Sequence, residues 1–146
     1  LGGYFGSRLM SNIREEKGYT YGINASIASF PFQGYLAIGT ETDNEYVEPC
    51  TREVKYEMRR LQEELIPEQE LSMVKNYMIG EMCRNYEDPF SLSDAWIFVK
   101  TAGLENNFFQ TLAEKIRRVK AEELRDLAFR YFQSENMIEV VAGKKM

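Results

Sequence analysis

Arg14 and Tyr21 are the residues of this chain whose types and spacing could do chemistry. They flank a corner in the stretch REEKGYTYG, which runs from Arg14 to Gly22. A guanidinium and a phenol are both hydrogen-bond donors, and neither loses its proton readily near neutral pH. Two converging donors suit a carbonyl oxygen, above all one that gains negative charge in a tetrahedral transition state. The pair therefore favours the binding of a substrate carbonyl and does not suit a nucleophile.

A purely structural role explains the same two residues. A basic side chain in the last turn of a helix offsets the helix dipole, and Arg14 can also pair with Glu15 or Glu16 at the surface with little energetic consequence. Tyr21 follows the same period-two apolar pattern as Ile23, so it can equally be a core residue. Short motifs are weak on their own, and spacing alone leaves both interpretations open.

The end of a helix and the start of a strand must position this pair. Apolar residues at a spacing of four predict an amphipathic helix over residues 5–17. We expect Gly18 to form a structural corner at its end, because glycine takes the left-handed conformation without steric cost. From Tyr19 the apolar period changes to two, which predicts a strand folded back beside the helix end. Arg14 and Tyr21 then converge across the corner.

The rest of the chain predicts a hairpin, several helices and a closing strand. Residues 19–27 and 35–42 form the hairpin, and apolar stripes at helical spacing follow it. A β-branched run over residues 137–143 predicts the last strand. This order indicates an α+β fold of two layers, with a largely antiparallel sheet covered by helices on one face. With 146 residues, 44% of them hydrophobic, the chain fits a single domain over residues 1–146.

Composition argues against several functions. The net charge of -5 disfavours nucleic acids and anionic membranes as partners, because attraction to phosphate dominates affinity for both. No window is apolar for the length that a membrane span needs. The chain contains no histidine, so on its own it cannot build a typical catalytic zinc site or a general-base triad. We therefore predict neither a metal site nor a cofactor site in this chain.

The number of cysteines indicates the kind of cellular compartment. Cys50 and Cys83 are the only two in the chain, and this number gives neither a disulfide framework nor a metal motif. We expect both to be small buried hydrophobic residues in a reducing compartment, which favours the cytoplasm without fixing the localisation.

The opening stretch LGGYFGSRLMSNIREEKGYTYGI resembles the signature region of the pitrilysin family of zinc peptidases. That family includes insulin-degrading enzyme and the mitochondrial processing peptidase. The shared features are GG, then S-R-L on a helix, then R-E-x-x-G-x-x-Y entering a strand. The order of hairpin, long helices and closing strand is also similar to the later part of the family's repeating domain, so the resemblance covers essentially the whole chain.

The resemblance implies the later part of the C-terminal, non-zinc domain of a longer peptidase. In this family the N-terminal half carries an H-x-x-E-H zinc motif, and the C-terminal half supplies an Arg and a Tyr to the substrate. Arg14 and Tyr21 match that pair in type and spacing. By resemblance they would polarise the scissile carbonyl and stabilise its oxyanion, with Gly18 shaping the corner that aims them. Arg8 also matches a frequent family residue, and we expect it to be structural.

Three functions remain open under this resemblance. The chain can be the substrate-binding part of a zinc metallopeptidase that acts on a peptide or small protein, with zinc in the N-terminal half of the parent. It can be a non-zinc helper subunit whose homologous partner subunit bears the zinc. It can also be a noncatalytic scaffold or interaction domain of the same fold.

The start of the sequence adds one expectation. Leu1-Gly2-Gly3 is typical of the inside of a loop, so we expect further strands to precede it in a longer protein. Without them the fragment would expose apolar surface and could self-associate.

Overall fold

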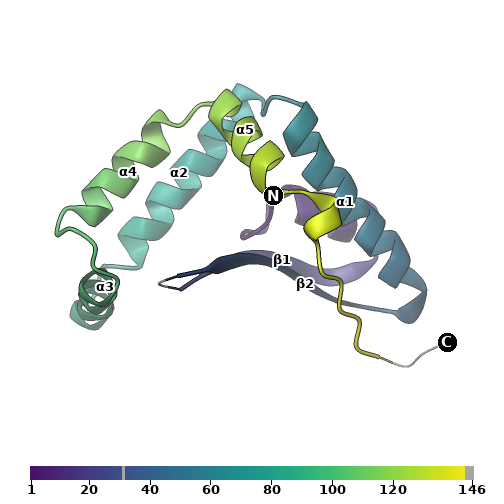
Figure 1. The fold of residues 1–146 in the computed structure, drawn as a ribbon, viewed down its shortest axis with the longest axis horizontal. Helices are drawn as coiled ribbons and strands as arrows, with labels where there is room; N and C mark the ends of the chain where they lie inside the picture. The colour runs from purple at the N-terminus through teal and green to yellow at the C-terminus, as the bar shows by residue number, and fades with distance from the viewer. Residues whose placement is uncertain (31, 144–146) are drawn as a thin grey trace. The chain divides into compact units, whose positions relative to one another are not determined.

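The computed structural model describes residues 1–30 and 32–143. The chain divides into two compact units, one made of Leu1–Glu64 with Arg125–Met146 and the other of Leu65–Leu124. The elements, in chain order, are the π-helix η1 (Met10–Glu16), β1 (Thr20–Ser29), β2 (Gly34–Thr42), the 3₁₀ turn η2 (Asn44–Tyr46), α1 (Val47–Glu63), α2 (Glu68–Arg84), α3 (Pro89–Thr101), α4 (Phe108–Arg118), α5 (Ala121–Tyr131) and the 3₁₀ turn η3 (Ser134–Asn136) (Figure 1). An antiparallel pair of strands accompanied by helices confirms the predicted α+β class.

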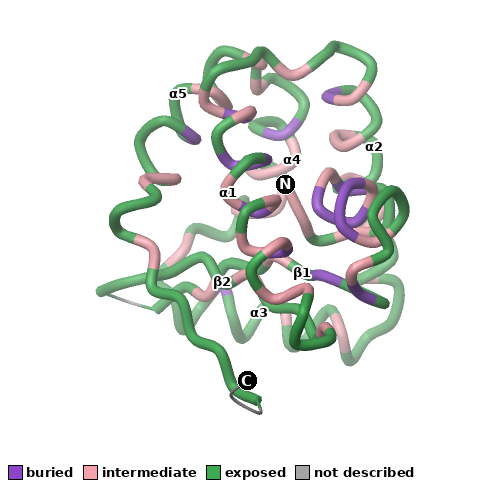
Figure 2. The backbone as a smooth tube through the Cα atoms, turned by 90° about the vertical axis from the view of Figure 1, so that its right-hand side faces the viewer, coloured by how far each residue is buried: buried purple, intermediate pink, exposed green. Residues whose placement is uncertain are grey.

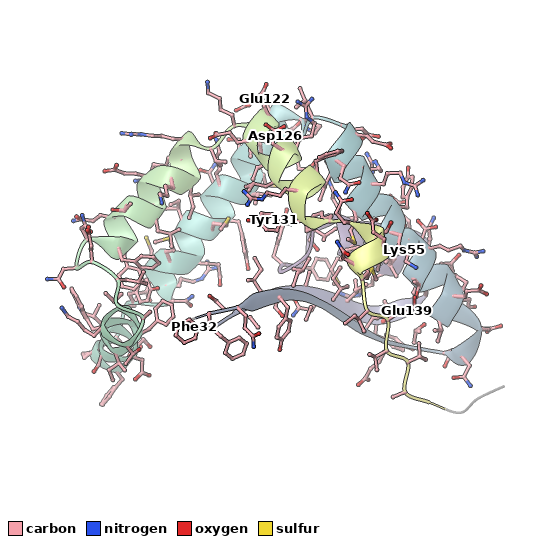
Figure 3. All side chains as sticks on the ribbon, in the orientation of Figure 1. Phe32, Lys55, Glu122, Asp126, Tyr131 and Glu139 are labelled. Atoms are coloured by element: carbon pink, nitrogen blue, oxygen red, sulfur yellow. The ribbon has the colours of Figure 1, made fainter. Side chains whose placement is uncertain are left out.

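The hairpin is the sheet of the first unit. β1 and β2 pair antiparallel, from Thr20 opposite Thr42 to Ser29 opposite Gly34, as the change of period at Tyr19 predicts. At the end of the hairpin Phe32 is fully exposed (Figure 3).

The core of the first unit is built from the first helix, β1 and α1. Leu9 and Ile13 are completely buried there. They meet Ile23 of β1 and an α1 stripe at helical spacing, Cys50, Val54 and Met58. Buried positions along β1 and α1 appear as purple segments in Figure 2. Burial of each large apolar side chain stabilises the unit by roughly 1.5–3 kcal/mol, which holds the segment carrying Arg14 against the sheet.

The first helix is shorter than the predicted span of residues 5–17. Helical backbone begins at Arg8 and winds as a π-helix from Met10, so that the N–H of Lys17 reaches the carbonyl of Asn12 five residues back at 3.1 Å. The start was predicted too early because the preceding residues form a turn. Gly3 has a φ of 106°, outside the helical region.

The predicted closing strand over residues 137–143 is wrong. Within the described part of the chain this segment is extended but pairs with no strand. Side chains attach it to α1 instead, because Glu139 lies 3.6 Å from the ammonium of Lys55 and accepts a hydrogen bond from Thr51 at 3.3 Å (Figure 3). A β-branched run becomes a strand only where a neighbour supplies the ladder of hydrogen bonds, and the hairpin does not do so here.

The second unit contains α2, α3 and α4. α2 contributes the buried Leu71 and α4 the buried Ile116, and the ammonium of Lys75 on α2 donates to the carbonyl of Arg117 on α4 at 3.2 Å. Asp88 caps α3 by accepting from the N–H groups of Phe90 and Ser91, and Pro89 is the first residue of this helix. None of the described helices is both long enough and apolar enough to cross a membrane.

The two cysteines differ in their surroundings. Cys50 is buried on α1 as predicted, whereas Cys83 on α2 is exposed, so the prediction of two buried thiols is wrong for Cys83. The reason is its position on the helix. The buried residue of α2 is Leu71 near its start, and Met78 is itself exposed, so the end of the helix that carries Cys83 has no buried face to cover the thiol.

Candidate functional site

Gly18 forms a tight corner between η1 and β1. Its φ is 65°, a left-handed conformation that strains residues with a Cβ. Its N–H donates to the carbonyl of Arg14 at 3.2 Å, and the N–H of Tyr19 donates to the carbonyl of Ile13 at 3.0 Å. A Cβ on Gly18 would meet no atom within 4 Å. The requirement for glycine is therefore set by the backbone conformation and not by crowding.

Arg14 lies in the last turn of η1, beside this corner. The carbon centre of its guanidinium is 4.7 Å from the centroid of the Phe5 ring, within cation–π range. Neither Glu15 nor Glu16 forms an ion pair with it among the described residues. Short π-helical segments are frequent at functional sites, and here one places Arg14 against an aromatic ring instead of a carboxylate.

Tyr21 is not a core residue, because its side chain is 97% exposed. The register of the hairpin explains why. Thr20 lies opposite Thr42, but Ile23 lies opposite Thr40. Two residues of β1, Tyr21 and Gly22, therefore stand against one residue of β2, which is a β-bulge.

The bulge reverses which side chains of β1 face the core. Thr20 and Ile23 are three positions apart and both are buried, although residues three apart in a regular strand face opposite sides. The predicted shared face of Tyr21 and Ile23 is therefore wrong. The period-two pattern runs through residues 19–27 in the sequence, but the extra residue breaks it in the structure.

Tyr21 and Phe5 line the same open hollow of about 770 Å³ in the first unit. The complete lining is Gly3, Tyr4, Phe5, Met10, Thr20, Tyr21, Gly22, Ile23, Asn24, Gly39, Thr40 and Glu41. Arg14 is not part of this lining. Its guanidinium covers the Phe5 ring, so the structure relates Arg14 to the hollow through Phe5 and provides no direct contact between Arg14 and Tyr21.

The chemistry available at the hollow is that of hydrogen-bond donors and aromatic faces. The phenol of Tyr21 on the wall of the hollow and the guanidinium of Arg14 over the Phe5 ring can each donate to a carbonyl oxygen. Across residues 1–30 and 32–143, no group of three or more His, Cys, Asp or Glu side chains is placed to hold a metal ion. Among the described residues, the side chains that line this hollow do not form a set of zinc ligands; they offer aromatic faces and hydrogen-bond donors.

Sequence reasoning missed Phe5 as a partner of Arg14 and missed the bulge at Tyr21. The predicted helix over residues 5–17 includes Phe5, but the turn before Arg8 leaves this residue outside the helix and 59% exposed. The signal for the bulge was present in the sequence. A glycine inside a strand, here Gly22, often marks a bulge or a close approach of backbones. Arg8 begins the first helix and is partly buried.

Known proteins share the sequence and the fold of this chain. Residues 1–78 match the family model described as the peptidase M16 inactive domain. The chain is 30% identical, over 151 aligned positions, to the "Non-peptidase homolog YmxG" of Helicobacter pylori. Its fold superposes with a TM-score of 0.80 and 20% identity on the crystal structure of a peptidase M16 inactive domain from Pseudomonas fluorescens, covering 90% of this chain. It superposes equally well, at 18% identity and over 91% of this chain, on a protease from Helicobacter pylori.

The chain corresponds to about a third of each of these proteins. It spans 34% of the YmxG sequence, 31% of the Pseudomonas fluorescens chain and 32% of the Helicobacter pylori protease chain. The two structural matches, at or below 20% identity, establish the shared fold.

Proposed function

Since the chain belongs to the peptidase M16 inactive domain family, we propose that it forms a substrate-binding part of a larger zinc-dependent peptidase and is not catalytic by itself. The single observation that carries this proposal is the exposed Tyr21 on the wall of the hollow, together with Arg14 over Phe5, a residue of the same wall. The bulge keeps the Tyr21 side chain out of the core, so the protein loses the free energy that burial of this ring would give. This loss favours a functional role for Tyr21 at the surface.

In this proposal Arg14 and Tyr21 donate to the carbonyl oxygen of the peptide bond to be cleaved. Their contribution is larger in the transition state than in the ground state, because the oxygen gains negative charge as the bond breaks. Phe5 supports the guanidinium from one side, which limits the rotamers of Arg14 and reduces the entropy lost on binding. Gly18 sets the angle at which the helix end meets β1.

The chemistry of bond cleavage belongs to another part of the protein or to a partner subunit. A zinc ion there would supply the activated water. The residues of this chain bind and orient the peptide and supply half of the chamber around it.

A second candidate is a noncatalytic domain that binds a peptide or a partner through the same hollow. The name of the YmxG relative, a non-peptidase homolog, favours this alternative. Arg14 and Tyr21 would then bind a carbonyl of the ligand without any transition state to stabilise, and their loss would weaken binding alone.

Peptide turnover by the full-length protein, or by its complex with the zinc-bearing partner, separates the two candidates. We compare wild type with Arg14→Ala and Tyr21→Phe. We expect kcat to fall about tenfold or more in each variant, with Tm unchanged, because a transition-state donor is lost. Matched controls are Arg118→Ala on α4 and Tyr131→Phe on α5, which change the same side-chain types at exposed positions that are not part of the lining of the hollow.

Three other outcomes of this experiment would change the conclusion. An active wild type with unchanged kcat in both variants would reject the donor role. An inactive wild type whose affinity for an extended peptide falls in both variants would favour the noncatalytic binding domain. Equal losses in the control variants would mean that the effect is not specific to the hollow.

A further inference from the structure

We infer that Thr20 and Thr40 are positioning residues, whose hydroxyl groups lock the β-bulge that turns Tyr21 toward the hollow. This inference rests on the proposed function for its effect on turnover, but the lock itself can be tested without any activity. It assigns a role to two residues whose hydroxyl groups are engaged within the hairpin.

The hydroxyl of Thr20 stands at the centre of the bulge. It donates to the carbonyl of Glu41 at 2.6 Å and accepts from the N–H of Gly22 at 3.1 Å. Glu41 is the one residue of β2 that stands against the bulge, and Gly22 is one of the two bulged residues. A single buried hydroxyl therefore connects the strands at the point where the regular ladder is interrupted.

Thr40 completes the connection from the neighbouring strand. Its Oγ1 lies 2.8 Å from Oγ1 of Thr20 and 2.9 Å from the carbonyl oxygen of Gly22. Its one proton can be donated to either oxygen, and both arrangements tie β2 to the bulged segment. Both polar groups of Gly22, which follows Tyr21 directly, are thus held by threonine side chains.

The register of the hairpin decides which side of β1 the Tyr21 side chain occupies. A register slip of one residue on β1 would remove the bulge and return Tyr21 to the side of the strand that packs on the core. Thr20 cannot bond Gly22 and Glu41 simultaneously in that register. The two hydroxyls therefore favour the register in which the phenol faces the hollow.

The test is a double-mutant cycle in the full-length protein, with Thr40→Val, Tyr21→Phe and the double variant. Valine keeps the shape of threonine and replaces the hydroxyl with a methyl group, which cannot form the hydrogen bonds. We expect Thr40→Val to lower kcat roughly threefold to tenfold with little change in KM, because Tyr21 is misaligned. In the Tyr21→Phe background, Thr40→Val should have almost no effect on kcat, because the phenol hydroxyl that it misaligns is already absent.

Thr40→Ser and Thr101→Val serve as controls. Serine keeps the hydroxyl, so Thr40→Ser should retain most of the wild-type kcat. Thr101 lies on α3, where its hydroxyl bonds the carbonyl of Ile97 within its own helix, and Thr101→Val should leave kcat unchanged. If Thr40→Val lowers kcat by the same factor with and without Tyr21, or lowers only Tm, the positioning role is overturned.

Hydrogen exchange distinguishes failure of this inference from failure of the proposed function. We expect the amide of Gly22 to exchange several-fold faster in Thr20→Val than in wild type, because its acceptor is lost. Unchanged exchange would overturn the lock even if Tyr21→Phe impairs turnover. Faster exchange together with a fully active Tyr21→Phe variant would reject the donor role of Tyr21 and keep the lock.

Discussion

The side-chain amide of Asn12 donates a 2.8 Å hydrogen bond to the carboxylate of Glu57, joining η1 to α1 inside the first unit. Glu57 is only 2% exposed, and a buried carboxylate is costly unless it is paired. Arg60 supplies the countercharge at 3.4 Å. Since Asn12 precedes Arg14 by two residues, this contact also fixes the segment that carries the candidate donor.

The first prediction concerns this contact. Asn12→Ala removes a hydrogen bond to a charged, buried group, and we expect it to lower the free energy of unfolding by about 2 kcal/mol or more. Urea denaturation of the purified protein measures the change. Glu53→Gln is the control, because the Glu53 carboxylate also accepts from Asn12, at 3.1 Å, but is partly open to solvent. A loss for Asn12→Ala no larger than for this control would contradict the prediction.

The second prediction contrasts two glycines. Gly18→Ala forces a residue with a Cβ into the left-handed region at φ 65°, and we expect a loss of roughly 1–2 kcal/mol of stability. Gly80 lies inside α2 with no atom within 4 Å of an added Cβ, so Gly80→Ala should stabilise by about 0.5–1 kcal/mol. Thermal unfolding of both variants gives the comparison. Two shifts of the same sign would count against the assigned role of Gly18.

The third prediction is a pH dependence of α3. Hydrogen bonds from the side chain and backbone of Ser91 hold the pKa of Asp88 below its ordinary value of 3.8. Because the folded-state pKa is the lower one, this cap stabilises the protein at pH values above 3.8 and is lost as the pH falls through the folded pKa.

Asp88→Asn and Asp88→Ala separate the cap from its charge. Asparagine also caps helices but does not titrate, so the Asp88→Asn variant should lose less stability below pH 3.8 than wild type does. Asp88→Ala should be the less stable variant at neutral pH. Unfolding curves measured across the acid range check both expectations. Parallel pH profiles for wild type and Asp88→Asn would show that Asp88 does not titrate through this cap.

The fourth prediction concerns thiol reactivity. Burial raises the pKa of the Cys50 thiol, an effect partly opposed by the hydrogen bond with Thr42 and reinforced by the nearby charge of Glu53. A raised pKa leaves less of the reactive thiolate at any given pH. We therefore expect an alkylating reagent to modify Cys83 quickly and Cys50 only after unfolding. Mass spectrometry of the native protein tests this, with Cys83→Ser as the control in which rapid labelling disappears.

The hairpin and the helices could be predicted from the sequence because their signals are local. The change of apolar period at Tyr19 marks β1, and the turn of the chain at residues 88–89 marks the boundary between α2 and α3. The closing strand over residues 137–143 could not be predicted in the same way. Its β-branched residues favour extended backbone, but a strand exists only with a partner, and the partner is not a property of the segment itself.

The sequence by itself determined the α+β class, the family and the choice of Arg14 and Tyr21, since residue type and spacing carry that information. Only the tertiary structure decided that Tyr21 lies outside the core and that Arg14 rests on Phe5. The bulge at Tyr21 depends on which residues of β2 stand opposite it, and the register of two strands is set by contacts across the hairpin. The position of Phe5 depends on the backbone turn before the helix. Both are relationships between segments, which the apolar period of either segment alone does not contain.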